Sequence, residues 1–522
     1  AHEELDSPEY TVPATETDKT TGYKYATDEV TNNAVSNLFD DVSSGTAKDG
    51  TKISNIEYMS RSDFEGSFPT TVTDRTLTVE QNNKFKFEVT DNPGDPWYSD
   101  TKPTQATEAY GVAPIQLYDM LYQDEDGKWH VYDFADGGEG EKKWKDLLDQ
   151  LTVAEMKELV VKALYRTAPI DSIGKPLSSD GDGPVGHAVF MGNPRTYDVC
   201  YYASECVMAA TWNTELAEAF GTMIGDEALI GNAKGDGVPY TGWYAPAVNI
   251  HRSQFSGRNY EYYSEDGFIS GKMAAAVIRG AQSKGVITYV KHFAVNDQET
   301  DRDTTGLATW ANEQSMREIY FLPFETAVKE GKSKGVMSSF NRLGTIWAGG
   351  SHDLLTKLLR DEWGFKGTVV TDYNLTSYMD VNQMVRAGGD TSLSASKPFS
   401  SKSATAQAQL RRATQNVLYT YASSNMMNGL GKGVKFGYRI PLWVELLIWL
   451  NVVVFVVGAG ITTAMILLAR RRLKMQNAGD GDGADRENTA DADTTDASDA
   501  TATTDSSEEN SEQKNNSKSE DK

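Results

Sequence analysis

The sequence is poor in cysteine, in positive charge and in the residue spacings that hold metal ions, and each shortage argues against a class of function. Its 522 residues include only two cysteines, Cys200 and Cys206. They could form a disulfide, but the gap between them holds two tyrosines and has no metal or redox signature, so we expect two free, partly buried thiols. The net charge of −25 argues against a nucleic-acid partner, because phosphate binding requires a basic surface. No EF-hand or zinc spacing occurs, so we predict neither a metal nor another cofactor.

The beginning of the sequence also lacks an initial methionine and a secretion signal. The first residue is Ala1 rather than Met, and no charged, apolar and small-residue segment of the kind that directs secretion follows it. We therefore expect a fragment or processed form whose secretion signal, if it has one, lies outside the sequence. A chain of 522 residues is too long for one compact domain, which predicts two or more regions.

One long apolar run is present near the C-terminus. The 24 residues from Leu446 to Ala469 carry no charge. As a helix they would extend about 36 Å, enough to cross a bilayer core of roughly 30 Å. We predict a transmembrane helix over residues 442–469, with a buried core helix as the alternative. Trp443 and Trp449 suit one membrane interface.

The residues after the run predict its orientation. Three arginines and a lysine mark the cytoplasmic side by the positive-inside tendency, although the basic residues before the run weaken the contrast. The region before the helix would then be extracellular and anchored in the cell membrane by a single pass. Residues 475–522 hold 14 acidic against 4 basic residues and no aromatic residue, which predicts a disordered cytoplasmic tail. The basic residues are Arg470, Arg471, Arg472 and Lys474 after the run, and Lys432, Lys435 and Arg439 before it.

Asp372 stands at the end of a predicted buried strand. Residues 368–371 are a β-branched run that opens after Gly367, which is typical of a parallel strand buried on both faces. An amphipathic helix before it ends at Gly364. In a (β/α)8 barrel the carboxyl ends of the strands carry the catalytic groups, so Asp372 is a candidate nucleophile or base. The alternative is a helix N-cap, a common role for Asp after a strand.

Other segments bring polar groups to predicted strand ends or loops. Lys291 and His292 follow the strand predicted at 285–290, although a lone His is usually structural and a lone Lys usually lies on the surface. The glycine-rich segment 180–186 lacks the Lys-Ser/Thr of a P-loop and any dinucleotide fingerprint, so a plain turn is the alternative there. The polar and aromatic segment 257–266 could likewise be a solvated surface loop.

Together these segments resemble the catalytic barrel of glycoside hydrolase family 3, from the helix that begins after Thr152 to about Ser392. The family places its nucleophile in a Ser/Thr-Asp-aromatic step after a Trp-Gly-Phe-x-Gly strand, as at 363–373 here, and it also has an Asp-Gly-Pro-x-Gly loop, a Gly-Arg-Asn-x-Glu run and a Lys-His step. The resemblance implies a TIM-type (β/α)8 barrel with Asp372 as the nucleophile. It also implies sugar contacts for Asp182, Arg258, Lys291, His292, Arg302 and Met337. Arg302 is expected near the nucleophile, where its charge would favour the ionised carboxylate.

The sequence departs from the family at one position and leaves one role unfilled. Phe340 stands where the family commonly has a Tyr whose hydroxyl bonds the nucleophile, so one donor is lost. Retaining hydrolysis also needs a second carboxyl group as acid/base, about 5–5.5 Å from the nucleophile. The N-acetylglucosaminidase branch takes its proton donor from a Lys-His-Phe-Pro-Gly-His run, and the Lys-His-Phe-Ala-Val-Asn at 291–296 excludes that branch. In the other branch the acid/base Glu comes from a sandwich domain, so we expect it from an upstream domain or a companion chain.

The region before the barrel is acidic, aromatic and strand-prone. Residues 76–79 and 84–89 alternate in polarity as half-exposed strands do. Residues 37–41 and 58–64 resemble the segment that, in a subgroup with inverted domain order, joins a fibronectin-like module to a C-terminal barrel. We therefore predict an α/β chain with five regions: a β-rich linker at 1–140, the barrel at 141–425, a juxtamembrane linker at 426–441, the transmembrane helix at 442–469, and a basic stop with an acidic tail at 470–522.

The predicted function is that of a retaining, exo-acting β-glycosidase, similar to a β-glucosidase, which hydrolyses a glycoside or small oligosaccharide through a covalent intermediate on Asp372. The alternative is a catalytically inactive, membrane-tethered carbohydrate-binding protein. Phe340 and the missing sandwich domain favour the alternative, whereas Lys291 and Asp372 favour the enzyme.

Overall fold

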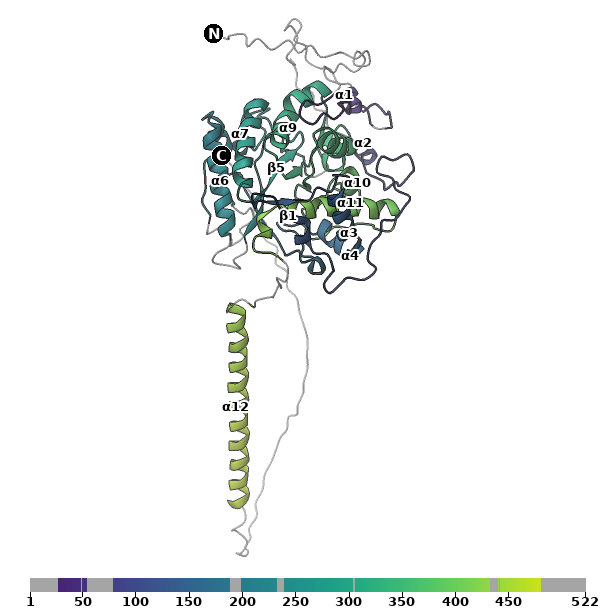
Figure 1. Ribbon diagram of the computed structural model, residues 1–522. Helices are drawn as coiled ribbons and strands as arrows, with labels where there is room; N and C mark the ends of the chain where they lie inside the picture. Colours follow the sequence, from purple (N-terminus) through teal and green to yellow (C-terminus); the bar gives the residue numbers. More distant parts are fainter. Residues whose placement is uncertain are drawn as a thin grey trace, which may run out of the picture. The chain divides into compact units, whose positions relative to one another are not determined.

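The computed structural model describes residues 27–47, 49–53, 78–187, 199–231, 239–303, 306–431, 440 and 442–479. The chain divides into two units, residues 1–438 and residues 439–522. Within the described residues, the first unit contains all the strands and the second contains one long helix, α12 (Leu442–Gly479). Figure 1 shows the ribbon with these elements labelled.

Five parallel strands form the central sheet of the first unit, in the order β10, β7, β5, β4 and β3. Their bounds are Ser179–Asp182 for β3, Tyr240–Tyr244 for β4, Ile287–Phe293 for β5, Gly335–Ser338 for β7 and Thr368–Thr371 for β10. Nearly every residue in them is buried, as expected for short apolar and β-branched runs covered on both faces. The strand predicted at 368–371 is confirmed, and the strand predicted at 285–290 forms a little further along the chain. Because the strands are parallel, their carboxyl ends meet at one edge of the sheet.

Extended segments continue the sheet beyond its two edge strands. Backbone hydrogen bonds run from β10 to residues 390–391, from residue 392 to residues 160–163, and from residues 165–167 to β3. The two edges are therefore connected, which gives the sheet the character of an α/β barrel. The described residues form five strands in this sheet, and the prediction of eight stays a prediction.

Helices connect successive strands and pack against the sheet. The main ones are α5 (Glu205–Ala209) and α6 (Thr214–Ile230) before β4, α7 (Gly267–Gln282) before β5, α9 (Leu322–Lys329) before β7, the π-helix η8 (Asp353–Glu362) before β10, and then α10 (Val381–Ala387) and α11 (Ala404–Ala422). Helices α6, α7 and α9 lie side by side (Figure 1). Before the sheet come α3 (Glu139–Asp149) and α4 (Val153–Val161), and α4 begins at a capping box of Thr152 and Glu155. Before α9 come α8 (Glu313–Ser315) and the π-helix η6 (Met316–Phe321), and Pro323 lies in the first turn of α9.

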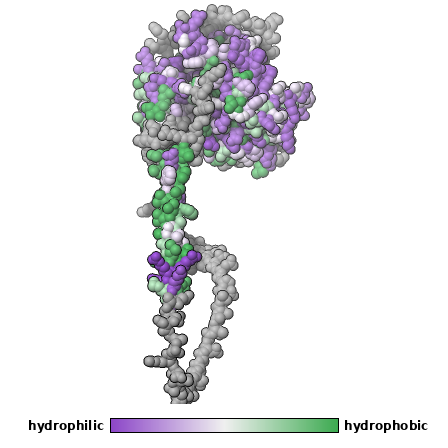
Figure 2. All heavy atoms as spheres, turned by 60° about the horizontal axis from the view of Figure 1, so that its bottom comes forward, coloured by the Kyte–Doolittle hydropathy of each residue, from purple (hydrophilic) through white to green (hydrophobic). Residues whose placement is uncertain are grey.

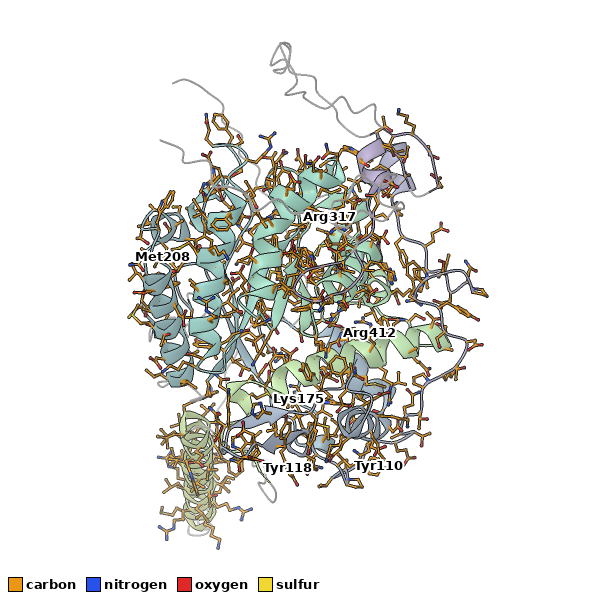
Figure 3. The ribbon with its side chains drawn as sticks, turned by 45° about the horizontal axis from the view of Figure 1, so that its top comes forward. Tyr110, Tyr118, Lys175, Met208, Arg317 and Arg412 are labelled. Carbon is orange, nitrogen blue, oxygen red and sulfur yellow. The ribbon has the colours of Figure 1, made fainter. Side chains whose placement is uncertain are left out.

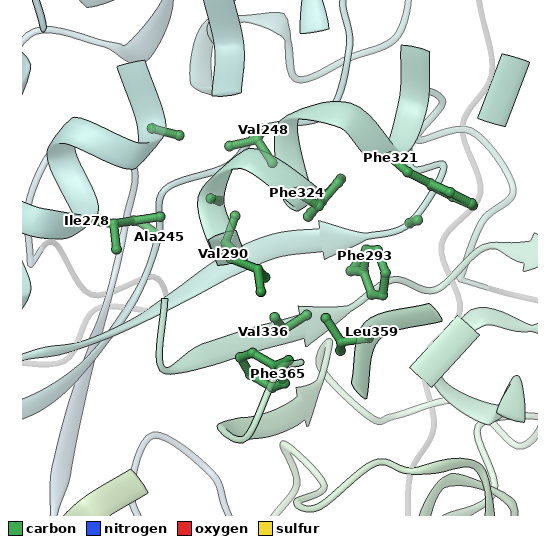
Figure 4. Packing of buried hydrophobic residues seen from close by; sticks show 14 of the residues in the cluster. Ala245, Val248, Ile278, Val290, Phe293, Phe321, Phe324, Val336, Leu359 and Phe365 are labelled. Atoms are coloured by element: carbon green, nitrogen blue, oxygen red, sulfur yellow. The ribbon is translucent and has the colours of Figure 1, made fainter. Parts of the chain in front are cut away.

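Alternate residues of the strands feed two apolar clusters. Val290, Val336 and Val369 pack with the helices of one cluster, which Figure 4 shows around Phe293, Phe324 and Leu359. Tyr289, Met337 and Val370, one position away on the same strands, belong to the second cluster together with α4 and α11. This is the two-residue period of a strand whose two faces are both covered. Packing on both faces holds the carboxyl ends of the strands in fixed positions.

The region before the barrel differs from the prediction. Residues 79–84 form a helix, α2 (Val79–Lys84), and residues 85–90 are not in a strand, so the predicted strand at 84–89 is wrong. Alternating polarity also occurs in surface segments that are not strands. Tertiary contacts decide whether such a segment becomes a strand. Residues 76–77 of the other predicted strand, and the segment 58–64, lie outside the described residues.

The described residues of this region instead pack along the barrel. Helix α1 (Asp40–Ser44) follows Phe39, whose backbone N–H donates to Glu313. Asp91 accepts two hydrogen bonds from Arg386 at 2.9 and 3.1 Å. The strands here are the short hairpin β1 (Leu121–Gln123) and β2 (Trp129–Val131); three more short strands, β6 (Ala308–Thr309), β8 (Arg342–Leu343) and β9 (Ile346–Trp347), form a separate sheet.

Helix α12 is long and apolar enough to cross a membrane, a criterion of length and composition that is met over Leu442–Gln476. Most of the side chains seen along it are apolar, and a hydrophilic patch lies where the basic residues follow (Figure 2). The basic residues at 432–439 and the acidic residues from 480 onward lie outside the described residues. The two cysteines are free, as predicted, although Cys200 is exposed rather than partly buried.

Candidate active site

Asp372 lies directly after β10, at the carboxyl edge of the sheet. Its backbone N–H donates to the carbonyl of Ser338 at 2.9 Å, and its Oδ1 accepts from the N–H of Tyr373 at 2.7 Å. The other carboxylate oxygen lies 3.1 Å from Nη1 of Arg302 and 3.7 Å from Nε2 of His292. The carboxylate is therefore fixed on one oxygen by the backbone and faces a cation with the other.

The alternative role of Asp372 as a helix cap is wrong. The next helix, α10, begins at Val381, and Asp380 caps it by accepting hydrogen bonds from the backbone N–H groups of Asn382 and Gln383. No helix begins beside Asp372, so helix capping does not explain why an acidic residue follows this strand.

Lys291 lies in β5 and pairs with an acid from β3. Its Nζ is 3.0 Å from Oδ1 of Asp182 and 3.8 Å from Oε2 of Glu261. Burial alone would lower the pKa of Lys291, but the two acids raise it above the ordinary value. The ammonium therefore stays charged and holds Asp182 at the edge of the sheet, where that carboxylate is partly exposed.

An alternating chain of acids and bases joins the two ends of the site. Arg258 bonds Glu261 through Nε at 2.5 Å and lies 3.5 Å from Glu299. Glu299 is 2.8 Å from Nε of Arg302, which reaches Asp372 with its other arm. Asp182 and Asp372 are thus connected, through Lys291 and this chain, by contacts of 3.8 Å or less. Paired charges of this kind orient one another and keep the loop that carries them in place.

His292 is buried and neutral. Burial, and then three neighbouring positive charges, lower its pKa well below the ordinary value. Those charges belong to Arg258, Lys291 and Arg302. Its Nδ1 lies 3.3 Å from the hydroxyl of Tyr262. The contact with Asp372 is therefore one between a carboxylate and a neutral imidazole, which can donate a hydrogen bond without neutralising the charge.

Tyr165 also belongs to the site, and no sequence motif marks it. Burial raises its pKa, and the negative charges of Asp182 and Asp372 raise it further, so both acids stand close to this one phenol. Its ring packs against that of Tyr244 at 5.6 Å. Tyr165 has a φ of 50°, a left-handed conformation that is strained for an aromatic residue and that recurs at functional sites.

Phe340 packs on the cation that faces Asp372. The Cζ atom of Arg302 is 4.6 Å from the centroid of the Phe340 ring. The carbonyls of Arg302 and Phe340 lie 2.7 and 2.9 Å from the hydroxyl of Tyr378, which ties the two segments together. The Phe340 ring therefore supports Arg302 by a cation–π contact, although it has no hydroxyl to offer Asp372.

A buried acid near the site is poorly placed for proton transfer to a substrate. Glu205, at the start of α5, is 2% exposed, and its Oε1 accepts from the N–H of Ala247 at 3.3 Å. Burial and the charge of Glu261 raise the pKa of Glu205 well above its ordinary value. Its inaccessibility makes Glu205 a poor proton donor to a bound substrate.

Ion pairs and close contacts connect six of the seven predicted site residues at one edge of the sheet, and the role predicted for the seventh, Met337, stays a prediction. Met337 is buried in β7 and packs in the second apolar cluster. The part of the chain described here contains no group of three or more His, Cys, Asp or Glu residues that could hold a metal ion. The six gathered residues are Asp182, Arg258, Lys291, His292, Arg302 and Asp372.

Comparisons with known proteins find similar sequences over part of this chain. Residues 194–413 match the family model described as "Glycosyl hydrolase family 3 N terminal domain". The chain is 39% identical over 232 residues to a beta-glucosidase of Rhizobium radiobacter, which covers 44% of this chain and 27% of that protein. It is 41% identical over 206 residues to Beta-glucosidase A of Butyrivibrio fibrisolvens, covering 39% and 23% of the two chains. A solved structure, beta-glucosidase 3B from Thermotoga neapolitana in complex with glycerol, has 31% identity and a TM-score of 0.48 over 55% of this chain and 43% of that one.

Residues 194–413 are therefore similar to the N-terminal domain of glycosyl hydrolase family 3, and the chain is similar to beta-glucosidases. The chain spans about a quarter of the length of these two curated relatives.

Proposed function

We propose that this chain supplies the barrel of a retaining, exo-acting β-glycosidase of the β-glucosidase kind. The observation that supports this most strongly is the pairing of a carboxylate at the end of β10 with Arg302, in the same network as an acid–lysine pair at the ends of β3 and β5. An ionised, oriented carboxylate is what attack on an anomeric carbon requires. A second, separate carboxylate beside an ammonium can grip sugar hydroxyls, since one accepts and the other donates.

Asp372 would act as the nucleophile. Its Oδ2 would attack the anomeric carbon and form a glycosyl ester, and water would then hydrolyse the ester. Arg302 would hold the carboxylate in position, with Glu299 and Phe340 holding the guanidinium. Asp182, Lys291, Arg258 and the neutral His292 would bind the hydroxyls of the terminal sugar.

The proton donor would come from a domain outside this sequence or from a companion chain. Departure of a poor leaving group needs general acid catalysis, whereas a leaving group of low pKa departs without it. This chain should therefore release dinitrophenolate from 2,4-dinitrophenyl β-glucoside and be much slower on an unactivated glucoside. The sugar specificity proposed here, glucoside-like, rests on the relatives.

Hydrolysis of 2,4-dinitrophenyl β-glucoside tests whether Asp372 is the nucleophile. We expect Asp372→Asn to lower the rate of dinitrophenolate release by about 10³-fold or more, because the amide is not a nucleophile. Asp361→Asn is the matched control, since Asp361 is an exposed acid paired with Lys357 at 3.2 Å on η8. It should retain wild-type rates. A rate for Asp372→Asn within about tenfold of wild type would refute the proposal.

The chain would work as a membrane-anchored protein with the barrel outside the cell. The proposal is supported by the length and apolarity of α12 and by the basic residues that follow it. Residues 470–522 would then lie in the cytoplasm.

The second candidate is a catalytically inactive protein that only binds carbohydrate. It is favoured by the loss of a hydroxyl at Phe340 and by the inaccessible Glu205. A covalent glycosyl adduct distinguishes the two candidates, because binding alone forms none.

A further inference from the structure

A large cavity lies at the opposite end of the sheet from Asp372. It has a volume of about 1410 Å³ and is bounded by the residues that enter β7 and β10, by the hairpin β1–β2, and by the end of α11 with the residues after it. Tyr118, labelled in Figure 3, is one of its lining residues. Pockets for single small molecules are typically about 300–1,000 Å³. This cavity therefore has room for a ligand of several units.

The lining is positively charged although the chain is strongly acidic. Five lysines and one aspartate line the cavity, a formal charge of +4, whereas the whole chain has a net charge of −25. The aspartate, Asp119, is already engaged, since it accepts from the backbone N–H of Gln116 at 2.8 Å. Acids outside the lining pair with three of the lysines, so any local attraction for anions comes from the remaining two. The lysines are Lys143, Lys329, Lys332, Lys334 and Lys366.

Two of the five lysines have no carboxylate partner among the described residues. Lys143, Lys329 and Lys366 each pair with an acid. Lys332 and Lys334 form no such pair, and the Nζ of Lys334 donates to the carbonyl of Ser423 at 2.9 Å. Burial lowers the pKa of Lys334 to about 8, so at pH 7 it is mostly charged. A partly buried ammonium with unfilled donor positions is stabilised by an anion.

Exposed aromatic rings line the same cavity. Trp129 is 62% exposed and Tyr122 is 39% exposed, and both line the cavity. Tyr122 stacks on His130 with ring centroids 5.4 Å apart, which fixes the orientation of its ring. Flat aromatic faces with a polar edge bind ligands that are apolar on one face and polar at the rim. A pyranose ring has that character.

We propose that this cavity is a second glycan site that binds an acidic oligosaccharide. Its carboxylate groups would pair with Lys332 and Lys334, and a sugar ring would stack on Trp129. The choice of a saccharide rests on the proposed glycosidase function, whereas the preference for an anion rests on the lining alone. The site would hold a charged polymer at the end of the barrel away from the reaction centre.

Binding of tetragalacturonate to the full-length chain in detergent micelles, measured by calorimetry, tests the proposal. We expect saturable binding below about 1 mM, weakened by salt. Lys334→Met and Trp129→Ala should each weaken it by about tenfold or more. Lys357→Met, which removes an exposed lysine from η8, is the matched control and should leave binding unchanged. Dinitrophenyl glucoside hydrolysis should be the same in all of these variants.

Three results would overturn the proposal. The first is no binding of tetragalacturonate at about 1 mM by a chain that melts as the wild type does. The second is equal affinity for neutral cellotetraose, which would remove the role of the lysines. The third is equal competition by inorganic phosphate with no effect of Trp129→Ala, which would leave an anion site without a sugar. Failure of the glycosidase proposal would appear separately, as an Asp372→Asn variant that releases dinitrophenolate as fast as the wild type.

Discussion

Arg302 holds two carboxylates at once, and this makes it a sensitive point of the site. Its Nε pairs with Glu299 at 2.8 Å and its Nη1 with Asp372 at 3.1 Å, while its planar face covers Phe340. A lysine offers one point charge and cannot keep both pairs. We expect Arg302→Lys to lower kcat/KM on dinitrophenyl β-glucoside by about 10- to 100-fold.

The control for this substitution is Arg279→Lys, which alters an exposed pair with Glu218 at 3.0 Å far from the sheet edge. It should have no effect on kcat/KM, because a surface ion pair contributes little. An Arg302→Lys variant as active as this control would show that Asp372 does not depend on Arg302.

Restoring a hydroxyl at position 340 should help the nucleophile. The ring of Phe340 covers Arg302, and a tyrosine there would add a donor beside the carboxylate. We expect Phe340→Tyr to raise the rate of dinitrophenolate release by about threefold or more, measured at saturating substrate. A lower rate at unchanged stability would indicate that the cation–π contact, and not the missing hydroxyl, sets the activity.

At the scale of residues, the site residues that belong to a sequence motif could be predicted. The Lys-His step and the Asp after a β-branched run are visible in the sequence, and the structure places Lys291, His292 and Asp372 in one network. Tyr165 could not be found this way, because its role comes from a left-handed backbone and a fold that brings it to Asp182 and Asp372. The sugar contact predicted for Met337 stays a prediction, since this residue is buried in β7 in the cluster that also contains Phe340.

At the scale of elements, close packing of α6 on α7 depends on two glycines. A Cβ added to Gly221 would lie 2.0 Å from the carbonyl oxygen of Val277, and one added to Gly280 would lie 2.1 Å from that of Glu218. Backbone atoms cannot move aside as a flexible side chain does. We expect Gly280→Ala to lower the free energy of unfolding by about 1–3 kcal/mol, measured by denaturant titration.

Gly111→Ala is the matched control for the helix contact, because a Cβ there meets nothing within 4 Å. It should change the free energy of unfolding by less than about 0.5 kcal/mol. Equal stability of the two variants would mean that α6 and α7 do not approach as closely as described.

Elements with strong local signals were predictable, and elements decided by packing were not. The β10 strand and the capped start of α4 follow from β-branched residues and from a capping box. The strand predicted at 84–89 is absent. An alternating pattern is a weak signal for a strand, because packing against neighbouring segments can override it. The π-helix η6 has no sequence signal that could have separated it from α9.

At the scale of the whole molecule, buried histidine makes stability depend on pH. His187 is fully buried, with its Nε2 3.2 Å from the carbonyl of Ile224, and burial lowers its pKa to about 4 from an ordinary value of 6.5. Between those values the unfolded chain binds a proton that the folded chain does not. Stability contributed by this group is therefore lost as pH falls from 6.5 toward 4, by about 1.4 kcal/mol per pH unit.

The variant His187→Phe should make this visible. It keeps a ring against Tyr240, whose centroid is 4.9 Å away, but cannot be protonated. We expect it to be less stable than wild type at pH 7, yet to lose less free energy of unfolding between pH 7 and pH 5, with denaturant titration as the measurement. Parallel losses in the two proteins would contradict the assignment.

The apolar helix α12 predicts how the whole chain partitions. Full-length protein should remain with liposomes after alkaline carbonate washing, because a helix of this length and hydropathy buries its surface in the bilayer. A variant with both Val454→Arg and Ile461→Arg should be released, since each central arginine costs about 2.5–3.5 kcal/mol. Release of the wild-type chain under the same washing would rule out a spanning helix.

The measurement that tests the central claim most directly is covalent trapping with 2,4-dinitrophenyl 2-deoxy-2-fluoro-β-glucoside, followed by peptide mass spectrometry. Its leaving group departs without a proton donor, and the fluorine slows breakdown of the ester, so the barrel alone should be labelled. We predict one fluoroglucosyl group per chain, located on Asp372 and absent in Asp372→Asn. A label on another carboxylate, or dinitrophenolate release at undiminished rate with no label, would contradict the account.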